Sequence, residues 1–504
     1  MIDRSLRRVL MVLLVGFAVL LVQISRVQVL QAEELRNNPD NGRSILRDFN
    51  QPRGPILTSD GIVVAESAEV FGSVFDYQRT YPQAELYAHT VGYYSFNLGA
   101  SGVERTYNDW LSGRAAALRL SGLNSFLGGA GEPGTVVLSI DHELQRRSQE
   151  LLGDRQGSVV MIEPTTGAVI AMYSSPSFDP NRLADHDGLA AEAASRELLA
   201  APGNPRRPAA YADKFFPGST FKVVTAAAAL ELEGLDGANL DLEPTTEYFA
   251  PLATRPIRNS GGRACGGSLE AMIAASCNTG FARLGAEFIG PEQMTSTAES
   301  FGFNAQPELD IDRATESDFP RDFGERLRAP EGENRVGVYA DSPVLAQSAL
   351  GQNSVSASAL QMAMVAAAVA NGGEVVAPHV VSRIERVDGS VAETIETDMS
   401  GKAISPQTSI ALQQAMRTAV AEGTATGLQL PGVEVGAKTG TAQLSQDSIG
   451  SHAWVIGFAG QPGFLPDIAF AVHVAADPGK PDQSGSRTAV PVARALLEEL
   501  FDLS

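Results

Sequence analysis

The segment that most restricts how this chain can fold is its N-terminus, MIDRSLRRVLMVLLVGFAVLLVQISR. Residues 9–25 carry no charged side chain, and this run of 17 residues reaches the lower limit for spanning a bilayer. Arg4, Arg7 and Arg8 precede it, and basic residues favour the cytoplasmic side of a membrane segment. We predict a cytoplasmic tail (1–8), a transmembrane anchor and an extracytoplasmic remainder. The alternative is a cleaved signal peptide, although no small-x-small cleavage site follows the run at once.

The rest of the chain has the composition of a folded protein of more than one domain. The whole chain has 504 residues, of which 44% are hydrophobic. Its net charge of −21 argues against a general nucleic-acid binder. The cysteines, Cys265 and Cys277, are able to form a disulfide outside the cytoplasm; the alternative is two buried free thiols. With these two cysteines and six scattered histidines, we predict no metal site and no cofactor.

Residues 26–150 predict an extracytoplasmic, non-catalytic pedestal domain. A polar stalk extends to about residue 50, and two short strands then flank a turn at Ser59–Gly61. GVERTYNDWLSG, residues 102–113, has helical periodicity, with Val103, Tyr107 and Leu111 on one face. A strand at 134–141 precedes a further helix.

Residues 151–504 predict one α+β domain with strands at both of its ends. The predicted elements are a hairpin over 157–175, Ala-rich helices between 219 and 425 interrupted by an acidic solvated loop at 304–342, strands at 433–444, 452–459 and 467–475, and a final helix at 488–502. We expect an antiparallel sheet that joins the first hairpin to the last strands, flanked and interrupted by helices.

Lysine is rare in this chain, which makes Lys222 informative. Lysine occurs only at 214, 222, 402, 438 and 480, and arginine supplies the other basic side chains. Ser219 lies three residues before Lys222, so the two side chains share one face of a first helical turn. Apolar neighbours and the helix N-terminus would lower the lysine pKa, and a neutral amine activates a serine nucleophile. The alternatives are a capping serine and a lysine that extends from a surface helix to solvent.

Two further motifs follow in order along the chain. Ser276 and Asn278 end an Ala-rich helical stretch, where such residues are also common turn formers. VEVGAKTGTAQ places Lys438-Thr439-Gly440-Thr441 in a strand, and a strand glycine often marks close approach of a ligand or backbone. Each motif alone is weak evidence, but the three together indicate a catalytic site.

Ser-x-x-Lys, Ser-x-Asn and Lys-Thr-Gly resemble the active-site motifs of penicillin-binding proteins and serine β-lactamases. The segments RGPILTSDG, GASGVERTYNDWLSG, LSIDHELQ and GQNSVSASALQMAMVAAAVANGG are similar to class B penicillin-binding proteins, and coverage runs from about residue 50 to the end. Within that class the chain resembles the short, division-associated transpeptidases of actinobacteria. The resemblance implies the penicillin-binding fold and a peptidoglycan D,D-transpeptidase that β-lactams acylate, acting in septal wall synthesis.

The resemblance also implies roles for the motif residues. Ser219 would attack the penultimate D-Ala carbonyl of a D-Ala-D-Ala stem peptide, Lys222 would take its proton and Ser276 would relay one to the leaving group. The remaining roles concern substrate binding: Asn278 would hold Lys222 and the substrate amide, Lys438 and Thr439 would bind the terminal carboxylate, Gly440 would leave room for the peptide, and the N–H groups of Ser219 and Thr441 would form the oxyanion hole.

Cys277 is the middle residue of Ser-x-Asn, so a bond to Cys265 would fix this loop. The competing functions are a β-lactamase, a D,D-carboxypeptidase and, from another class, a β-lactam sensor or scaffold. The E-x-x-L-N pattern of class A β-lactamases is absent between Asn278 and Lys438, and sensors carry several membrane spans. The expected partners are stem peptides, β-lactams, the membrane, a polytopic glycan polymerase and division proteins.

Overall fold

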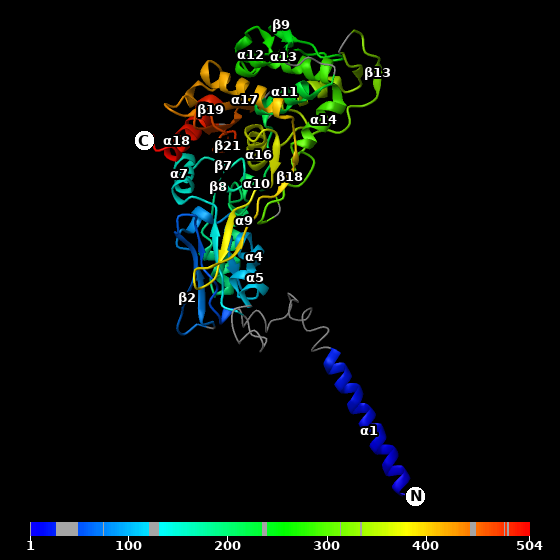
Figure 1. Ribbon diagram of the computed structural model, residues 1–504, viewed down its shortest axis with the longest axis vertical. Helices are drawn as coiled ribbons and strands as arrows, with labels where there is room; N and C mark the ends of the chain where they lie inside the picture. The colour runs from blue at the N-terminus through cyan, green and yellow to red at the C-terminus, as the bar shows by residue number, and fades with distance from the viewer. Residues whose placement is uncertain are drawn as a thin grey trace. The chain divides into compact units, whose positions relative to one another are not determined.

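Figure 1 shows the computed structural model, which describes residues 2–26, 49–73, 75–119, 131–233, 239–312, 314–332, 335–443, 450–477, 479–480 and 483–503. Two compact units divide the chain. One consists of Met1–Pro52 and Ser67–Gln78, and the other of Arg53–Glu66 and Arg79–Ser504.

The first unit contains α1 (Ile2–Ser25). Within it, Arg7–Ser25 has a mean hydropathy of 2.3 over 19 residues, and this is the one helix in the described part of the chain that is long and apolar enough to cross a membrane. The helix agrees with the predicted anchor. The predicted stalk lies almost entirely outside the described residues.

The second unit is built around an antiparallel sheet of strand order β19-β20-β21-β7-β8. Its strands come from both ends of the predicted catalytic domain, as expected (Figure 1). They are β7 (Gly157–Ile162), β8 (Val169–Ser175), β19 (Glu434–Gln443), β20 (Ser451–Gly460) and β21 (Ile468–Val474). Every residue of β20 and β21 is buried, because helices pack on this sheet and leave neither face exposed. β19 is an edge strand, so one side of its backbone is available to other groups.

Helices fill the chain between the two parts of this sheet, as predicted. They are α11 (Lys222–Glu231), α12 (Leu269–Ala274), α13 (Asn278–Arg283), α14 (Gly290–Ser300), α15 (Ser342–Ser348), α16 (Ala359–Ala370) and α17 (Pro406–Ala421). α16 packs against β7, β20 and β21, while α18 (Val490–Leu500) and α7 (His142–Leu152) pack against each other and the sheet. Alanine side chains let these helices lie close to the strands.

A second sheet was only partly predicted. Its order is β17-β16-β6-β1-β2-β3, with β1 (Ile56–Leu57), β2 (Val63–Glu69), β3 (Tyr77–Thr80), β6 (Thr135–Leu138), β16 (Val381–Glu385) and β17 (Val391–Thr394). The strands beside the turn at Ser59–Gly61 were expected. β16, however, lies in the region where we predicted helices, and it pairs antiparallel with β6, Ile384 opposite Val136. Strand β16 thus ties the pedestal to the catalytic part of the chain.

The predicted solvated loop at 304–342 is also partly wrong. Asp310 is half-buried, and its carboxylate accepts hydrogen bonds from the Val380 and Val381 N–H groups and the Tyr107 hydroxyl. Burial raises its pKa despite these bonds. The segment therefore joins the start of β16 to the pedestal helices α4 (Gly102–Thr106) and α5 (Asn108–Leu111).

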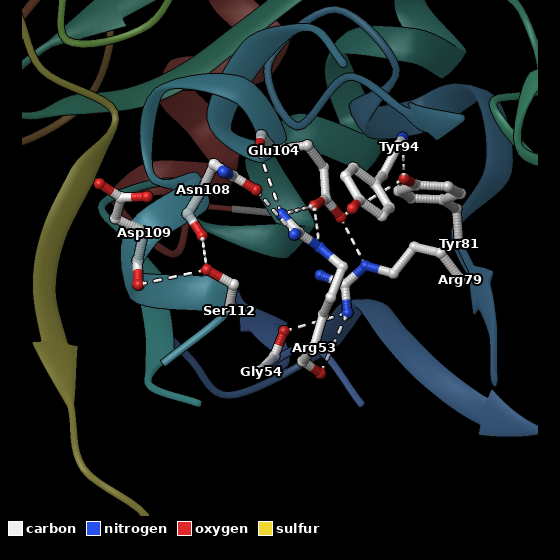
Figure 2. Close-up of polar contacts among 9 residues, drawn as sticks. All are labelled: Arg53, Gly54, Arg79, Tyr81, Tyr94, Glu104, Asn108, Asp109 and Ser112. Carbon is white, nitrogen blue, oxygen red and sulfur yellow. Dashed lines mark hydrogen bonds and ion pairs between the residues drawn. The ribbon is translucent and has the colours of Figure 1, made fainter. Parts of the chain in front are cut away.

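A buried charge cluster organises the pedestal (Figure 2). Glu104 of α4 is completely buried, and its carboxylate forms ion pairs with Arg53 Nη2 at 2.8 Å and with Arg79 Nε at 2.5 Å. Arg53 also donates to Asn108 at 2.8 Å and lies 3.8 Å from the centre of the Tyr94 ring. Burial alone would raise the pKa of Glu104, but the charges and hydrogen bonds of the two arginines outweigh it and lower the pKa.

We predict that Glu104→Ala lowers the free energy of unfolding by about 3–5 kcal/mol, because it leaves two buried guanidinium groups without their carboxylate. The measurement is urea unfolding of the purified protein. Glu197→Ala is the matched control, since its ion pair with Arg182 is largely exposed and such pairs contribute about 1 kcal/mol or less. Equal losses in the two variants would contradict this account.

Candidate active site

Ser219 lies in a tight turn rather than at a helix cap. The 3₁₀ helix η4 (Gly218–Phe221) contains it and leads directly into α11, and neither helix has a side-chain cap bond. Gly218 adopts a φ of 53° and donates its N–H to Gly351 at 2.9 Å. Only glycine adopts this conformation without strain. The Ser219 hydroxyl makes no hydrogen bond to a described residue, so it is free to react.

Lys222, the first residue of α11, is completely buried. Its Nζ lies 2.7 Å from the Ser276 carbonyl oxygen, 2.7 Å from Asn278 Oδ1 and 3.4 Å from Ser276 Oγ. Burial, followed by the charge of Lys438, lowers its pKa well below the usual value. A neutral amine has two hydrogens, which the two short bonds use, so its lone pair remains available to accept a proton.

The loop before α13 holds Ser276 in an unusual conformation. Ser276 has a φ of 56°, in the left-handed region that non-glycine residues rarely adopt. The next residue, Cys277, forms a disulfide with Cys265 and donates its N–H to Met272. The side chain of Asn259 accepts from the Thr279 N–H at 2.9 Å and fixes the other side of the loop. A strained backbone conformation of this kind persists only where contacts with the surrounding residues hold it in place.

Lys438 approaches the same serine from β19. Its Nζ donates to Ser276 Oγ at 2.8 Å and to the Thr439 carbonyl at 2.9 Å. The side chain is completely buried, and burial lowers its pKa to about 7. Two lysines thus meet at one hydroxyl. This arrangement suits proton transfer among Lys222, Ser276 and a group bound beside Ser219.

The other β19 residues have different surroundings. Thr439 is buried and its hydroxyl donates to Thr424 Oγ1 at 2.8 Å, whereas Thr441 is exposed and its Oγ1 accepts from the Gly485 N–H at 3.2 Å. Sequence reasoning missed Thr424, which belongs to none of the three motifs.

Gly440 packs closely against the turn that carries Ser219. A Cβ added to Gly440 would lie 2.9 Å from the Pro217 carbonyl oxygen and 3.0 Å from Thr220 Cγ2. Its missing side chain therefore makes room for the turn that carries Ser219, a contact that we had not predicted; the room for a substrate peptide stays a prediction.

The structure brings the three motifs together beside an edge strand, in an arrangement typical of serine enzymes that form acyl intermediates through a lysine base. The family described as the penicillin binding protein transpeptidase domain matches residues 157–498, and the penicillin binding protein A dimerisation domain matches residues 53–137. The chain belongs to the penicillin-binding protein transpeptidase family, in its class B.

Individual relatives support this family assignment. The peptidoglycan D,D-transpeptidase PbpA of Mycolicibacterium smegmatis is 33% identical over 98% of both chains, and that of Mycobacterium tuberculosis is 32% identical over 98% of both. The ceftriaxone acyl-enzyme complex of M. tuberculosis penicillin-binding protein A is similar at a TM-score of 0.78 and 30% identity, covering 90% of this chain and 99% of that one. Its imipenem acyl-enzyme complex gives a TM-score of 0.77 at 30% identity, with 90% and 100% covered.

The pKa of Lys438 predicts a decline in activity on the alkaline side. The second-order rate constant for acylation by a penicillin should fall as pH rises through about 7, because Lys438 then loses the charge that attracts the ligand carboxylate. Arginine keeps its charge, so Lys438→Arg should lack this fall even if it reacts more slowly. Stopped-flow acylation between pH 5 and 10 measures both profiles. A profile of the same shape in the variant would refute the assignment.

The disulfide predicts a second effect. Cys265→Ala keeps Cys277 within Ser-x-Asn but removes the bond, so Ser276 is held less firmly. We expect acylation to slow several-fold and unfolding to become easier by about 2–3 kcal/mol. Rates and urea unfolding are compared with the parent protein, whose free thiols are counted after denaturation without reductant. Two titratable thiols in the parent, or an unchanged rate in the variant, would oppose this prediction.

Proposed function

We propose that this protein is a serine-type peptidoglycan D,D-transpeptidase. Ser219 Oγ attacks the carbonyl carbon of the penultimate D-Ala of a stem peptide, and Lys222 Nζ accepts the hydroxyl proton. The bond to the terminal D-Ala breaks, and Ser276 passes a proton to the departing amine. An amine of a neighbouring stem peptide then attacks the ester, forms the cross-link and returns the proton to Ser219.

The remaining motif residues bind the substrate in this proposal. Asn278 holds Lys222 and the substrate amide, while Lys438 and Thr439 provide charge and hydrogen bonds for the terminal carboxylate. Backbone N–H groups of Ser219 and Thr441 stabilise the oxyanion. β-Lactams acylate Ser219 because they resemble the dipeptide.

A single observation supports this mechanism most strongly: the buried Lys222 amine has a lowered pKa, and two short hydrogen bonds to the Ser276 loop hold it in place. A surface lysine would make neither bond. The buried position excludes the alternative in which Lys222 extends to solvent.

The location of the protein follows from its N-terminal helix. We infer that α1 anchors the protein with residues 1–8 in the cytoplasm and the catalytic part outside, because Arg4, Arg7 and Arg8 precede the apolar run. We also infer a role in septal wall synthesis alongside a polytopic glycan polymerase and division proteins. The match of residues 53–137 to a dimerisation domain supports protein contacts by the pedestal.

Labelling with a fluorescent penicillin tests the mechanism. The full-length protein in detergent should carry a stable adduct that maps to Ser219, and Ser219→Ala should carry none. Lys222→Arg should lose acylation by at least about 100-fold, since a guanidinium cannot act as the base. Lys402→Arg is the matched control, because Lys402 is exposed on β18 (Met399–Lys402).

The fate of the adduct separates the competing functions. An adduct that persists for many minutes fits a transpeptidase, whereas rapid hydrolysis would indicate a β-lactamase. With a D-Ala-D-Ala peptide and an added amino-acid acceptor, a transpeptidase forms the exchanged peptide and a carboxypeptidase forms only the shortened one. A label that survives Ser219→Ala would overturn the mechanism.

A further inference from the structure

Thr424, which lies outside the three motifs, is held beside strand β19. It follows α17, and its N–H donates to the Ala274 carbonyl oxygen at 3.1 Å. The preceding Gly423 allows this approach, since a Cβ there would lie 2.4 Å from the same oxygen. On its other side, Thr424 Oγ1 accepts from the Thr439 hydroxyl at 2.8 Å. Thr424 therefore connects the end of α12 to β19.

The hydrogens of this threonine pair can be counted. Two hydroxyls hold two hydrogens, and one of these is used between Thr439 and Thr424. No described residue accepts a hydrogen bond from the Thr424 hydroxyl. Thr439 is 6% exposed, whereas Thr424 is partly exposed. The hydrogen that remains for a ligand is therefore on Thr424.

Lys438 provides positive charge near the threonine pair but little direct contact for a ligand. Its side chain is 0% exposed, and its Nζ already donates to Ser276 Oγ and the Thr439 carbonyl. An anion bound at the free edge of β19 would be attracted electrostatically by this charge across the threonine pair. The Thr424 hydroxyl, 2.8 Å from that of Thr439, combines solvent access with an uncommitted hydrogen; Thr441, two residues further along β19, is also exposed.

We infer that Thr424 is a substrate-binding residue whose hydroxyl donates a hydrogen bond to the terminal carboxylate of the donor peptide, and to the equivalent carboxylate of a β-lactam. Thr439 then also acts as a positioning residue, because its hydroxyl orients that of Thr424. This inference rests on the proposed function, because it assigns the ligand of the same site.

The test measures acylation of the full-length protein by a penicillin and separates the binding constant from the rate of the chemical step. Thr424→Val removes the hydroxyl and keeps the shape of the side chain. We expect the dissociation constant to rise about 10- to 100-fold, as for a lost hydrogen bond to a charged group, with the chemical step nearly unchanged. Thr424→Ser should restore binding to within about threefold.

Two controls make the experiment specific. Thr426→Val changes an exposed threonine two residues away and should have no effect. The methyl ester of the same penicillin lacks the carboxylate charge, so it should react equally with the parent and with Thr424→Val. If Thr424→Val does not fold, as judged by thermal unfolding, Thr424→Ala replaces it.

Three results would overturn the inference: an unchanged dissociation constant, a loss confined to the chemical step, or an equal loss with the ester. Each requires that the parent protein still be labelled at Ser219. If the parent carries no label at Ser219, the proposed function itself fails, and the two failures are thus distinguished.

Discussion

The catalytic part of this protein depends on the enclosure of two lysine side chains around one hydroxyl, that of Ser276. Removing an ammonium from water costs several kcal/mol, so a buried lysine must gain partners or lose its proton. Lys222 and Lys438 both gain partners. Each has two short hydrogen bonds, and burial lowers both pKa values. Because the charge of Lys438 lowers the pKa of Lys222, the pair suits the base and the cation of the proposed mechanism.

This enclosure requires three distant segments to meet closely, and small residues make that possible. Gly440 lets β19 lie against the turn of Ser219, and Gly351 lets its own segment approach that turn, since a Cβ on Gly351 would lie 2.3 Å from the Gly218 carbonyl oxygen. The Cys265–Cys277 disulfide holds the third segment, next to Ser276 in its left-handed conformation. The sheet provides the rigid base for all three, since its central strands are buried along their full length.

Local patterns in the sequence were enough to predict much of this arrangement. Apolar runs bounded by turn signals identified the hairpin at 157–175 and the three last strands, and the rarity of lysine identified Lys222 and Lys438. Contacts between distant residues could not be predicted in the same way. Strand β16 pairs with a strand more than two hundred residues earlier. Nothing in the sequence around Thr424 indicates its hydrogen bond with Thr439. Glycine at position 440 was recognised, but its packing partner was not.

The two buried charge clusters of this chain show why it uses arginine in one and lysine in the other. Glu104 lies between Arg53 and Arg79, and guanidinium groups keep their protons even when buried, so the charges remain and the cluster is purely structural. At Ser276 the same degree of burial acts on lysines, whose protons can leave. The same burial therefore leaves a fixed ion cluster in the pedestal and, in the proposed mechanism, a proton acceptor in the catalytic part. In the proposed mechanism, the chemistry requires lysine at position 222 in a chain that otherwise prefers arginine.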